Sequence, residues 1–287
     1  ALAVGEMVTG VIDYDHRFDL MQQHSGEHIV SGIINARYGH HNVGFHMGIQ
    51  SITIDFDGMI PAEDLPGIES LANAAVYKSV PLHIWTPSPE ELPEVAYRTK
   101  RALPWPVRIV EVPGIDCCAC CGLHVARTGE IGLIKLFSMV KFRQGVRIEM
   151  LCGQRAFDFL SRSHEQNRQV SGAFSAKILE TGEAARKMNE LLESQKRRIA
   201  ELETRIFRSD ADRCTGRGDC LLIRAQLDSV GVRRLADLTA EACGGTAAVF
   251  SENPDGSFSY CLIHRDGDLR AFNREMTAAL NGRGGGR

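Results

Sequence analysis

The stretch His24-Ser25-Gly26-Glu27-His28 places two histidines four residues apart, near the start of a segment with helical periodicity. Ile29, Ile33 and Ile34 give the predicted helix a face toward the core, and Gly39 is a suitable residue to end it. Because residues i and i+4 lie on the same face of an α-helix, both imidazoles can approach one metal ion from a rigid base. The stretch therefore predicts half of a metal site.

A second pair with the same spacing follows in Cys120-Cys121-Gly122-Leu123-His124. Structural zinc takes four ligands in a tetrahedron, whereas catalytic zinc usually takes three and keeps a position for water or substrate. The two pairs together supply three imidazoles and one thiolate. We predict that Zn²⁺ is bound by His24, His28, Cys120 and His124.

The cysteine cluster permits another interpretation, because Cys117, Cys118, Cys120 and Cys121 could form a separate four-cysteine site in which the histidines have no role. Adjacent side chains diverge, however, so at most one or two of these thiols can share a tetrahedral centre. We interpret the other three as packing groups or as neighbours of the metal ligands.

The first stretch also satisfies H-x-x-E-H, the signature of a class of zinc peptidases in which the glutamate acts as general base. This alternative would make Glu27 catalytic. It requires a carboxylate as third ligand and leaves Cys120 and His124 without a function. We therefore interpret Glu27 as a solvated carboxylate or as a neighbour of the ligands.

The composition is that of an ordinary globular chain, with 33 basic and 36 acidic side chains and a formal net charge of −3 among 287 residues. No global excess of positive charge predicts nucleic-acid binding, so such binding would depend on a local basic surface. No apolar run approaches about 18 residues, and the first residues lack a signal-peptide pattern. The nine cysteines, an odd number, suit reduced thiols and metal in the cytosol. We expect a cytoplasmic protein that does not bind a membrane.

The first 162 residues mix the two element types without a regular βαβ rhythm, so the predicted fold class is α+β. Strands are predicted at 4–13, 51–56, 80–85, 107–112, 131–140 and 145–151, and helices at 61–78 and from residue 153. Residues 40–48 are predicted as a loop, and the proline-rich residues 86–106 as an irregular connection with one short helix.

Residues 163–210 are predicted as a long helix or helical hairpin, because this region is highly charged and free of proline. Ten positions spaced alternately by four and three residues form a heptad seam, and eight of the ten are apolar, which is typical of a coiled coil. The seam consists of Phe174, Ile178, Thr181, Ala185, Met188, Leu192, Gln195, Ile199, Leu202 and Ile206. We expect a homodimer through this seam, or a helical pair that separates two domains.

Residues 211–287 are predicted as a small α/β domain, with strands at 219–227, 246–251 and 258–264 and helices at 232–243 and 269–280. The chain ends in Gly282-Arg283-Gly284-Gly285-Gly286-Arg287. Backbone amides and the guanidinium groups of Arg283 and Arg287 could bind phosphate there. A flexible tail is the alternative.

With both ligand pairs, the chain resembles the editing domain of alanyl-tRNA synthetases and the free-standing AlaX-type editing proteins. The similarity lies in Arg17, in His24–His28 as the HxxxH element, in the strand Ser51–Phe56 and in Cys120–Val125 as the CxxxH element. It continues through residues 127–132 and 145–149. The last domain resembles the DHH-associated C-terminal domain of the same synthetases.

The chain departs from the family in its second element, usually Cys-Gly-Gly-Thr-His, because Cys121 and Leu123 occupy two of these positions. The region before Arg17 is too short for an aminoacylation domain and lacks most of the β-rich N-terminal domain. The sequence begins and stops abruptly, so we expect native sequence beyond each end. The resemblance predicts a long-form trans-editing module that does not charge tRNA.

The reaction that the resemblance implies is hydrolysis of the ester between serine or glycine and alanine tRNA. His46 is a candidate pocket group near water or the ribose, with a surface histidine as the alternative. The acceptor end of tRNA would need a basic rim. Candidates for the rim are Arg127, Lys135, Lys141 and Arg143. A tRNA-binding or dimerisation module with structural zinc is the second hypothesis, and the H-x-x-E-H peptidase the third.

Overall fold

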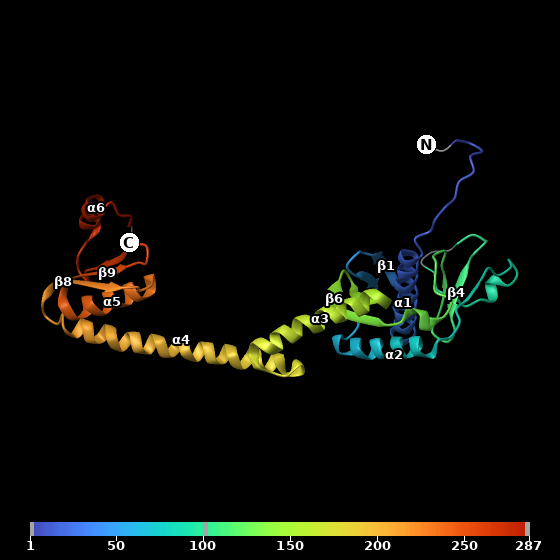
Figure 1. Cartoon of the computed structure of the whole chain (residues 1–287), viewed down its shortest axis with the longest axis horizontal. Coiled ribbons are helices and arrows are strands. Elements are labelled where there is room, and N and C mark those ends of the chain that lie inside the picture. Colours follow the sequence, from blue (N-terminus) through green and yellow to red (C-terminus); the bar gives the residue numbers. More distant parts are fainter. Residues whose placement is uncertain (1–2, 100–102, 285–287) are drawn as a thin grey trace. The chain divides into compact units, whose positions relative to one another are not determined.

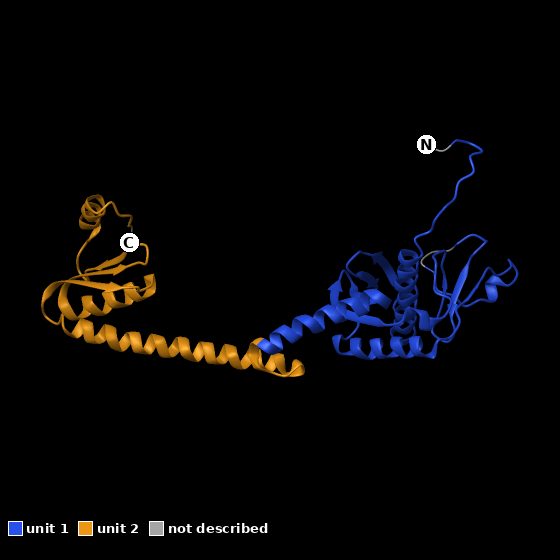
Figure 2. Ribbon diagram, viewed as in Figure 1, with its two compact units in different colours: residues 1–172 blue, residues 173–287 orange. Residues whose placement is uncertain are grey.

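The structure, a computed structural model, describes residues 3–99 and 103–284. It divides the chain into two compact units, residues 1–172 and residues 173–287 (Figure 2). Helices alternate irregularly with sheets that are mainly antiparallel, which confirms the predicted α+β class. Among the described residues, no helix is long and apolar enough to cross a membrane.

Helix α1 (Tyr14–Tyr38) carries the first histidine pair and packs against the other elements of unit 1 (Figure 1). The carboxylate of Asp13 caps its start by accepting the backbone N–H of His16. Its end at Gly39 is confirmed, since this residue adopts a left-handed conformation with φ 71° and donates its N–H to the carbonyl of Asn35. The segment from Gln22 to Ile34 is mostly buried.

A four-stranded antiparallel sheet forms the main wall of unit 1, in the order β1 (Asn42–Met47), β2 (Ile52–Phe56), β7 (Gly145–Cys152) and β6 (Ile134–Phe142). The predicted loop at residues 40–48 is wrong, because residues 42–47 pair with β2 as an edge strand. The strand predicted at 4–13 is also wrong, since no strand begins before Asn42 within the described residues.

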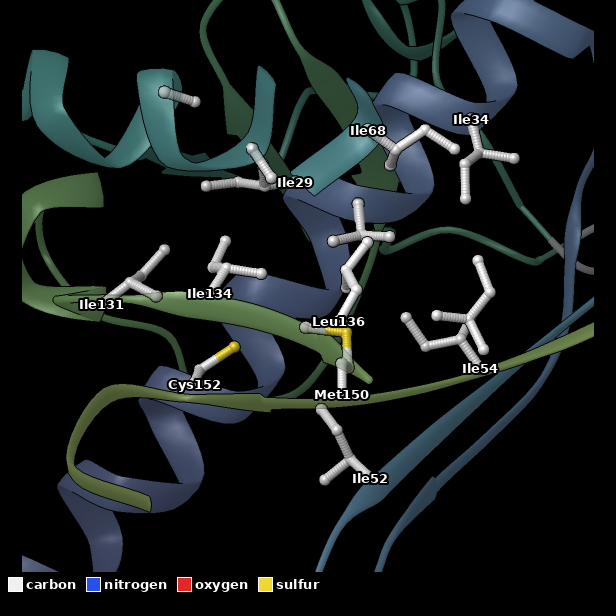
Figure 3. Close-up of a cluster of buried hydrophobic side chains, with 14 of the residues drawn as sticks. Ile29, Ile34, Ile52, Ile54, Ile68, Ile131, Ile134, Leu136, Met150 and Cys152 are labelled. Carbon is white, nitrogen blue, oxygen red and sulfur yellow. The ribbon is translucent and has the colours of Figure 1, made fainter. Parts of the chain in front are cut away.

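The core of unit 1 lies between this sheet, α1 and α2 (Leu65–Lys78), as Figure 3 shows. Its fully buried side chains are mostly branched aliphatics, which fill such a space densely. They include Ile29, Ile34, Ile52, Ile54, Ile68, Ile131, Ile134, Ile148 and Met150. This packing holds α1 firmly against the sheet.

A second antiparallel sheet, in the order β3 (His83–Trp85), β4 (Ile109–Val112) and β5 (Asp116–Ala119), leads the chain to Cys120. Three short 3₁₀ helices connect the elements of unit 1, η1 (Ala62–Asp64), η2 (Leu92–Glu94) and η3 (Thr128–Ile131). Because β5 also contacts α1, the second ligand pair, which follows β5 directly, is brought near the first pair on α1.

The long helical region is broken in two. Helix α3 (Gly153–Phe174) ends before Ser175, which has a positive φ of 50°, and the turn η4 (Ile178–Glu180) precedes α4 (Thr181–Asp212). The first two seam positions, Phe174 and Ile178, therefore lie outside α4. Residue 162 lies within α3, and the domain limits predicted from the sequence stay predictions.

Unit 2 contains a three-stranded sheet in the order β10 (Phe258–Ile263), β9 (Gly244–Glu252) and β8 (Gly218–Ala225). Strands β8 and β9 are parallel and joined through α5 (Ser229–Cys243), and α6 (Arg270–Ala279) follows β10. Each element predicted for this region has an observed counterpart. A core of Phe207, Val232, Leu235, Ala236 and Val249 joins the end of α4 to this sheet and α5.

Candidate metal centre

Four side chains of unit 1 converge: His24, His28, Cys120 and His124 each offer one donor atom, and these atoms all lie within 4.8 Å of one another. The Sγ atom of Cys120 is 3.5 Å from Nε2 of His24 and 3.4 Å from Nε2 of His124. Around a tetrahedral zinc ion, sulfur and nitrogen ligands lie about 3.6 Å apart. The donor set therefore fits one such ion.

In each of the three candidate ligand histidines, Nδ1 contacts a polar group outside the centre, so that Nε2 faces the centre. A ligand histidine commonly donates its other N–H to a carboxylate, carbonyl or similar acceptor, which fixes the ring and its tautomer. The Nδ1 atoms lie 3.2 Å from the carbonyl of Leu123 (His24), 3.0 Å from Oδ2 of Asp116 (His28) and 3.1 Å from Oγ of Ser25 (His124). These contacts prepare all three imidazoles to bind through Nε2.

The turn after Cys120 can approach α1 closely because residue 122 is a glycine. A Cβ atom at Gly122 would lie 2.2 Å from Cε1 of His24, well inside contact distance. The side chain of Arg108 donates to the carbonyls of Cys120 and Gly122, at 2.6 and 2.9 Å, and holds this turn in place. The backbone N–H of Gly122 also points to the sulfur of Cys120, at 3.4 Å.

The electrostatics of the cluster favour a thiolate at Cys120. Burial alone would raise the pKa of this thiol, but hydrogen bonds from His124, His24 and His28 lower the pKa to about 3. Burial lowers the pKa of His124 to about 4, which keeps this imidazole neutral.

His28 differs from the other imidazoles in its charge. Burial alone would lower the pKa of His28, but hydrogen bonds to Asp116 and Cys120 and the charge of Glu27 raise it to about 10. A metal ion on Nε2 would take the place of this proton, so binding would release it.

The remaining cysteines of the cluster are poor ligand candidates. Burial is the main reason that the pKa of Cys117 rises to about 11 and that of Cys118 to about 12, so both stay protonated at neutral pH. Cys121 is exposed. Cys118 also belongs to a group with His28 and Asp116 that could hold a metal ion, but this group shares His28 with the four-ligand set.

Glu27 is buried beside the centre, which agrees with its interpretation as a neighbour of the ligands and excludes a solvated carboxylate. Its Oε1 atom accepts hydrogen bonds from Oγ of Ser31 and Nδ2 of Asn42, both at 2.5 Å. Its Oε2 atom lies 3.9 Å from Nε2 of His28. The donor group around the two histidines is completed by a thiol and an imidazole, not by the carboxylate ligand that the peptidase alternative requires.

His46 does not lie with the ligands. It is exposed on β1, where neighbouring strand residues alternate between the two faces. The preceding residue, Phe45, is the one that stacks on the ring of His24, with 5.7 Å between the ring centroids. Phe45 was not singled out from the sequence, and nothing in the local pattern marks it.

The predicted basic candidates are distributed over several elements. Arg127 is exposed and donates to the carbonyl of Ser79, whereas Lys135 forms an ion pair with Glu69 at 2.9 Å. Lys141 and Arg143 are exposed near the turn between β6 and β7. Arg283 is exposed in the last described segment, and Arg287 lies outside the described residues.

The sequence of this chain is similar to known domains and proteins. Residues 107–149 match the domain described as the threonyl and alanyl tRNA synthetase second additional domain. Alanyl-tRNA editing protein Aarsd1-A of Xenopus laevis is 32% identical over 215 residues, which cover 70% of this chain and 52% of the relative. The Aarsd1 protein of Mus musculus is 28% identical over 193 residues, which cover 65% and 47%.

Alanine–tRNA ligase of Thermofilum pendens is 26% identical over 299 residues, covering 99% of this chain and 33% of the ligase. The chain thus spans about half the length of the editing proteins it matches. The matched domain includes the CxxxH element of the centre, Cys120–His124. The chain belongs to the AlaX-type family of alanyl-tRNA editing proteins.

Proposed function

We propose that this chain is an aminoacyl-tRNA deacylase that removes serine or glycine from wrongly charged alanine tRNA, with Zn²⁺ held by His24, His28, Cys120 and His124. The observation that carries the proposal is the convergence of these four donors with all three imidazoles oriented through Nδ1. When bound, zinc supplies a positive centre that orients the amino acid's amine or hydroxyl or polarises a water.

An aminoacyl ester is already reactive, so the protein chiefly needs to position the reactants and to exclude the correctly charged product. Glu27 offers a buried carboxylate next to the ligands, with one oxygen held by Ser31 and Asn42. A site that hydrogen-bonds the serine hydroxyl would reject alanine, because its polar groups would then be left unpaired. We keep His46 as a weaker candidate, for a contact with the ribose at the rim.

The proposed partner is the acceptor end of tRNA, a single strand that binds through phosphate contacts and base stacking. Among the four candidates for the rim, Arg127, Lys141 and Arg143 are exposed and could contact phosphates. Lys135 is already paired with Glu69, so we expect it to contribute less. Arg283 and Arg287 are proposed as a separate contact from the C-terminal region.

We further propose that unit 2 is the DHH-associated C-terminal domain and that α4 forms a coiled coil with a second copy of this chain. The seam residues Met188, Leu192, Ile199, Leu202 and Ile206 are all between 41% and 59% exposed, unusually high for large apolar side chains that repeat at heptad spacing. Pairing of two such helices would cover them.

A second function is favoured by one feature of the site. A closed set of four protein ligands is typical of structural zinc, whereas catalytic zinc usually keeps one position open. The chain could therefore bind tRNA and zinc without catalysing hydrolysis.

The test is a deacylation assay. We expect the protein to release serine from seryl-tRNA(Ala) faster than alanine from alanyl-tRNA(Ala), and His24→Ala to lose this release. His83→Ala is the matched control, because His83 is exposed on β3. Equal release of both amino acids would contradict the proposal, and tRNA binding without release would support the structural alternative.

A further inference from the structure

Behind the candidate centre, a buried carboxylate joins the ligand His28 to a guanidinium group. Oδ2 of Asp116 lies 3.0 Å from Nδ1 of His28. Arg98 donates to the same carboxylate through two atoms, Nε at 2.6 Å from Oδ1 and Nη2 at 2.9 Å from Oδ2. The side chain of Asp116 is only 1% exposed and that of His28 only 3%.

This arrangement defines the tautomer of His28. A carboxylate that receives two parallel N–H bonds from arginine is ionised and can only accept further hydrogen bonds. Nδ1 of His28 must therefore carry the proton that is shared with Asp116. Nε2 then faces Cys120 and the other two imidazoles, and it is the nitrogen whose proton a metal ion would replace.

Asp116 can reach His28 because β5 lies directly against α1. A Cβ atom at Gly32 would lie 2.4 Å from the carbonyl oxygen of Ile115 and 2.7 Å from Cβ of Asp116, so only glycine permits this approach. Asp116 also begins the strand that continues into Cys120. One carboxylate thus connects a ligand on α1 with the strand that directly precedes Cys120.

Arg98 is itself fixed by its backbone. Its N–H donates to the carbonyl of Cys117 at 2.7 Å, and its carbonyl accepts the N–H of Ala119 at 2.9 Å. The segment around Arg98 therefore runs along β5 like an additional strand. The Arg98 side chain is thus held at one end by its backbone contacts with β5 and at the other by Asp116.

We infer that Asp116, held by Arg98, is a positioning residue that sets the orientation of His28 and thereby the affinity of the centre for zinc. At Nδ1, the other two ligand imidazoles contact a carbonyl and a hydroxyl, so among the three ligand histidines only His28 has a charged partner on this nitrogen. A carboxylate partner raises the basicity of the ligand. This inference rests on the metal of the proposed function but not on its catalytic activity.

The test compares zinc affinity, measured by competition with a chromogenic chelator, in the full chain and in Asp116→Asn. We expect the variant to bind Zn²⁺ about 10- to 100-fold more weakly and to alter the visible spectrum of bound Co²⁺. The control is Asp55→Asn. Its partner Arg147 makes an equally close two-atom contact, at 2.6 and 2.8 Å, between β2 and β7 away from the ligands.

We expect the control to keep its zinc affinity. Unchanged affinity and Co²⁺ spectrum in Asp116→Asn would overturn the inference, as would an equal loss in both variants. Arg98→Ala should weaken binding in the same direction, and Arg98→Lys should restore part of it. These variants serve if Asp116→Asn does not fold.

A measurement on the unaltered protein is independent of folding in the variants. Nitrogen NMR of the zinc-loaded chain should show His28 protonated at Nδ1 and bound at Nε2, and metal on Nδ1 would refute the role of Asp116. A wild-type chain that binds no zinc overturns this inference together with the proposed cofactor. A chain that binds zinc but hydrolyses no ester contradicts only the proposed activity.

Discussion

Gly122→Ala is the substitution whose effect on the centre follows most directly from distances. The new methyl group would lie 2.2 Å from Cε1 and 2.6 Å from Nδ1 of His24, whereas ordinary contact begins at 3.4 Å. Relieving this overlap requires a movement of at least about 1.2 Å between the turn and the imidazole ring. Metal–ligand distances tolerate only about 0.2 Å. The movement would therefore remove His24 from the ligand set.

The loss of one ligand in four can be given a magnitude. Structural zinc sites bind with about 10–16 kcal/mol, so one ligand accounts for about 3 kcal/mol, or roughly a hundredfold in affinity. Chelator competition measures this change. The control is Gly67→Ala on α2, where the nearest atom to a new Cβ is 3.8 Å away. Equal zinc affinity in the two variants would refute the proposed placement of His24 against the turn.

Three further predictions test other parts of the chain. Glu27→Gln should slow serine release by about 100-fold with zinc content unchanged, because it removes the charge 3.9 Å from His28; an unaltered rate would exclude Glu27 from catalysis. Phe207→Ala should destabilise unit 2 by about 3–5 kcal/mol and leave zinc affinity intact, since Phe207 is buried in a core separate from the centre; a matching loss of zinc binding would contradict this separation. Leu192→Asp should convert a dimer to a monomer in light scattering, and a monomeric mass for both proteins would exclude pairing through α4.

The candidate ligands could be predicted because their signal is local. His24 and His28 are related by one helical turn, and Cys120 repeats the spacing with His124. Because neither pair can complete a four-ligand zinc site alone, both pairs are expected to bind the same ion. The structure brings the four side chains together as expected, although only the first pair lies on a helix and the second follows strand β5.

The partners of these ligands could not be predicted in the same way. Asp116 and Arg98 are separated by 18 residues, and Arg98 lies in a segment that was read as an irregular connection. Their pairing depends on how that segment runs along β5. The sequence leaves Glu27 either solvated or beside the ligands, and the choice depends on the packing of β1 against α1, which buries Glu27 with Asn42.

Errors in the predicted elements have similar causes. Residues 42–47 contain a glycine and polar side chains, so they resemble a loop, yet their backbone pairs with β2. The region of the seam was predicted as a long helix or a helical hairpin, and nothing in the heptad pattern marks the place where the backbone turns, at Ser175. In both places, contacts distant in sequence or a single backbone conformation outweigh the local pattern.

X-ray absorption spectroscopy of the zinc-loaded chain tests the central claim most directly, because it reports which atoms surround the ion. The account predicts one sulfur at about 2.3 Å and three nitrogens at about 2.0–2.1 Å, with the sulfur lost in Cys120→Ser. Two or more sulfurs would place the ion in the cysteine cluster, and a shell of nitrogen and oxygen without sulfur would contradict the four-ligand centre.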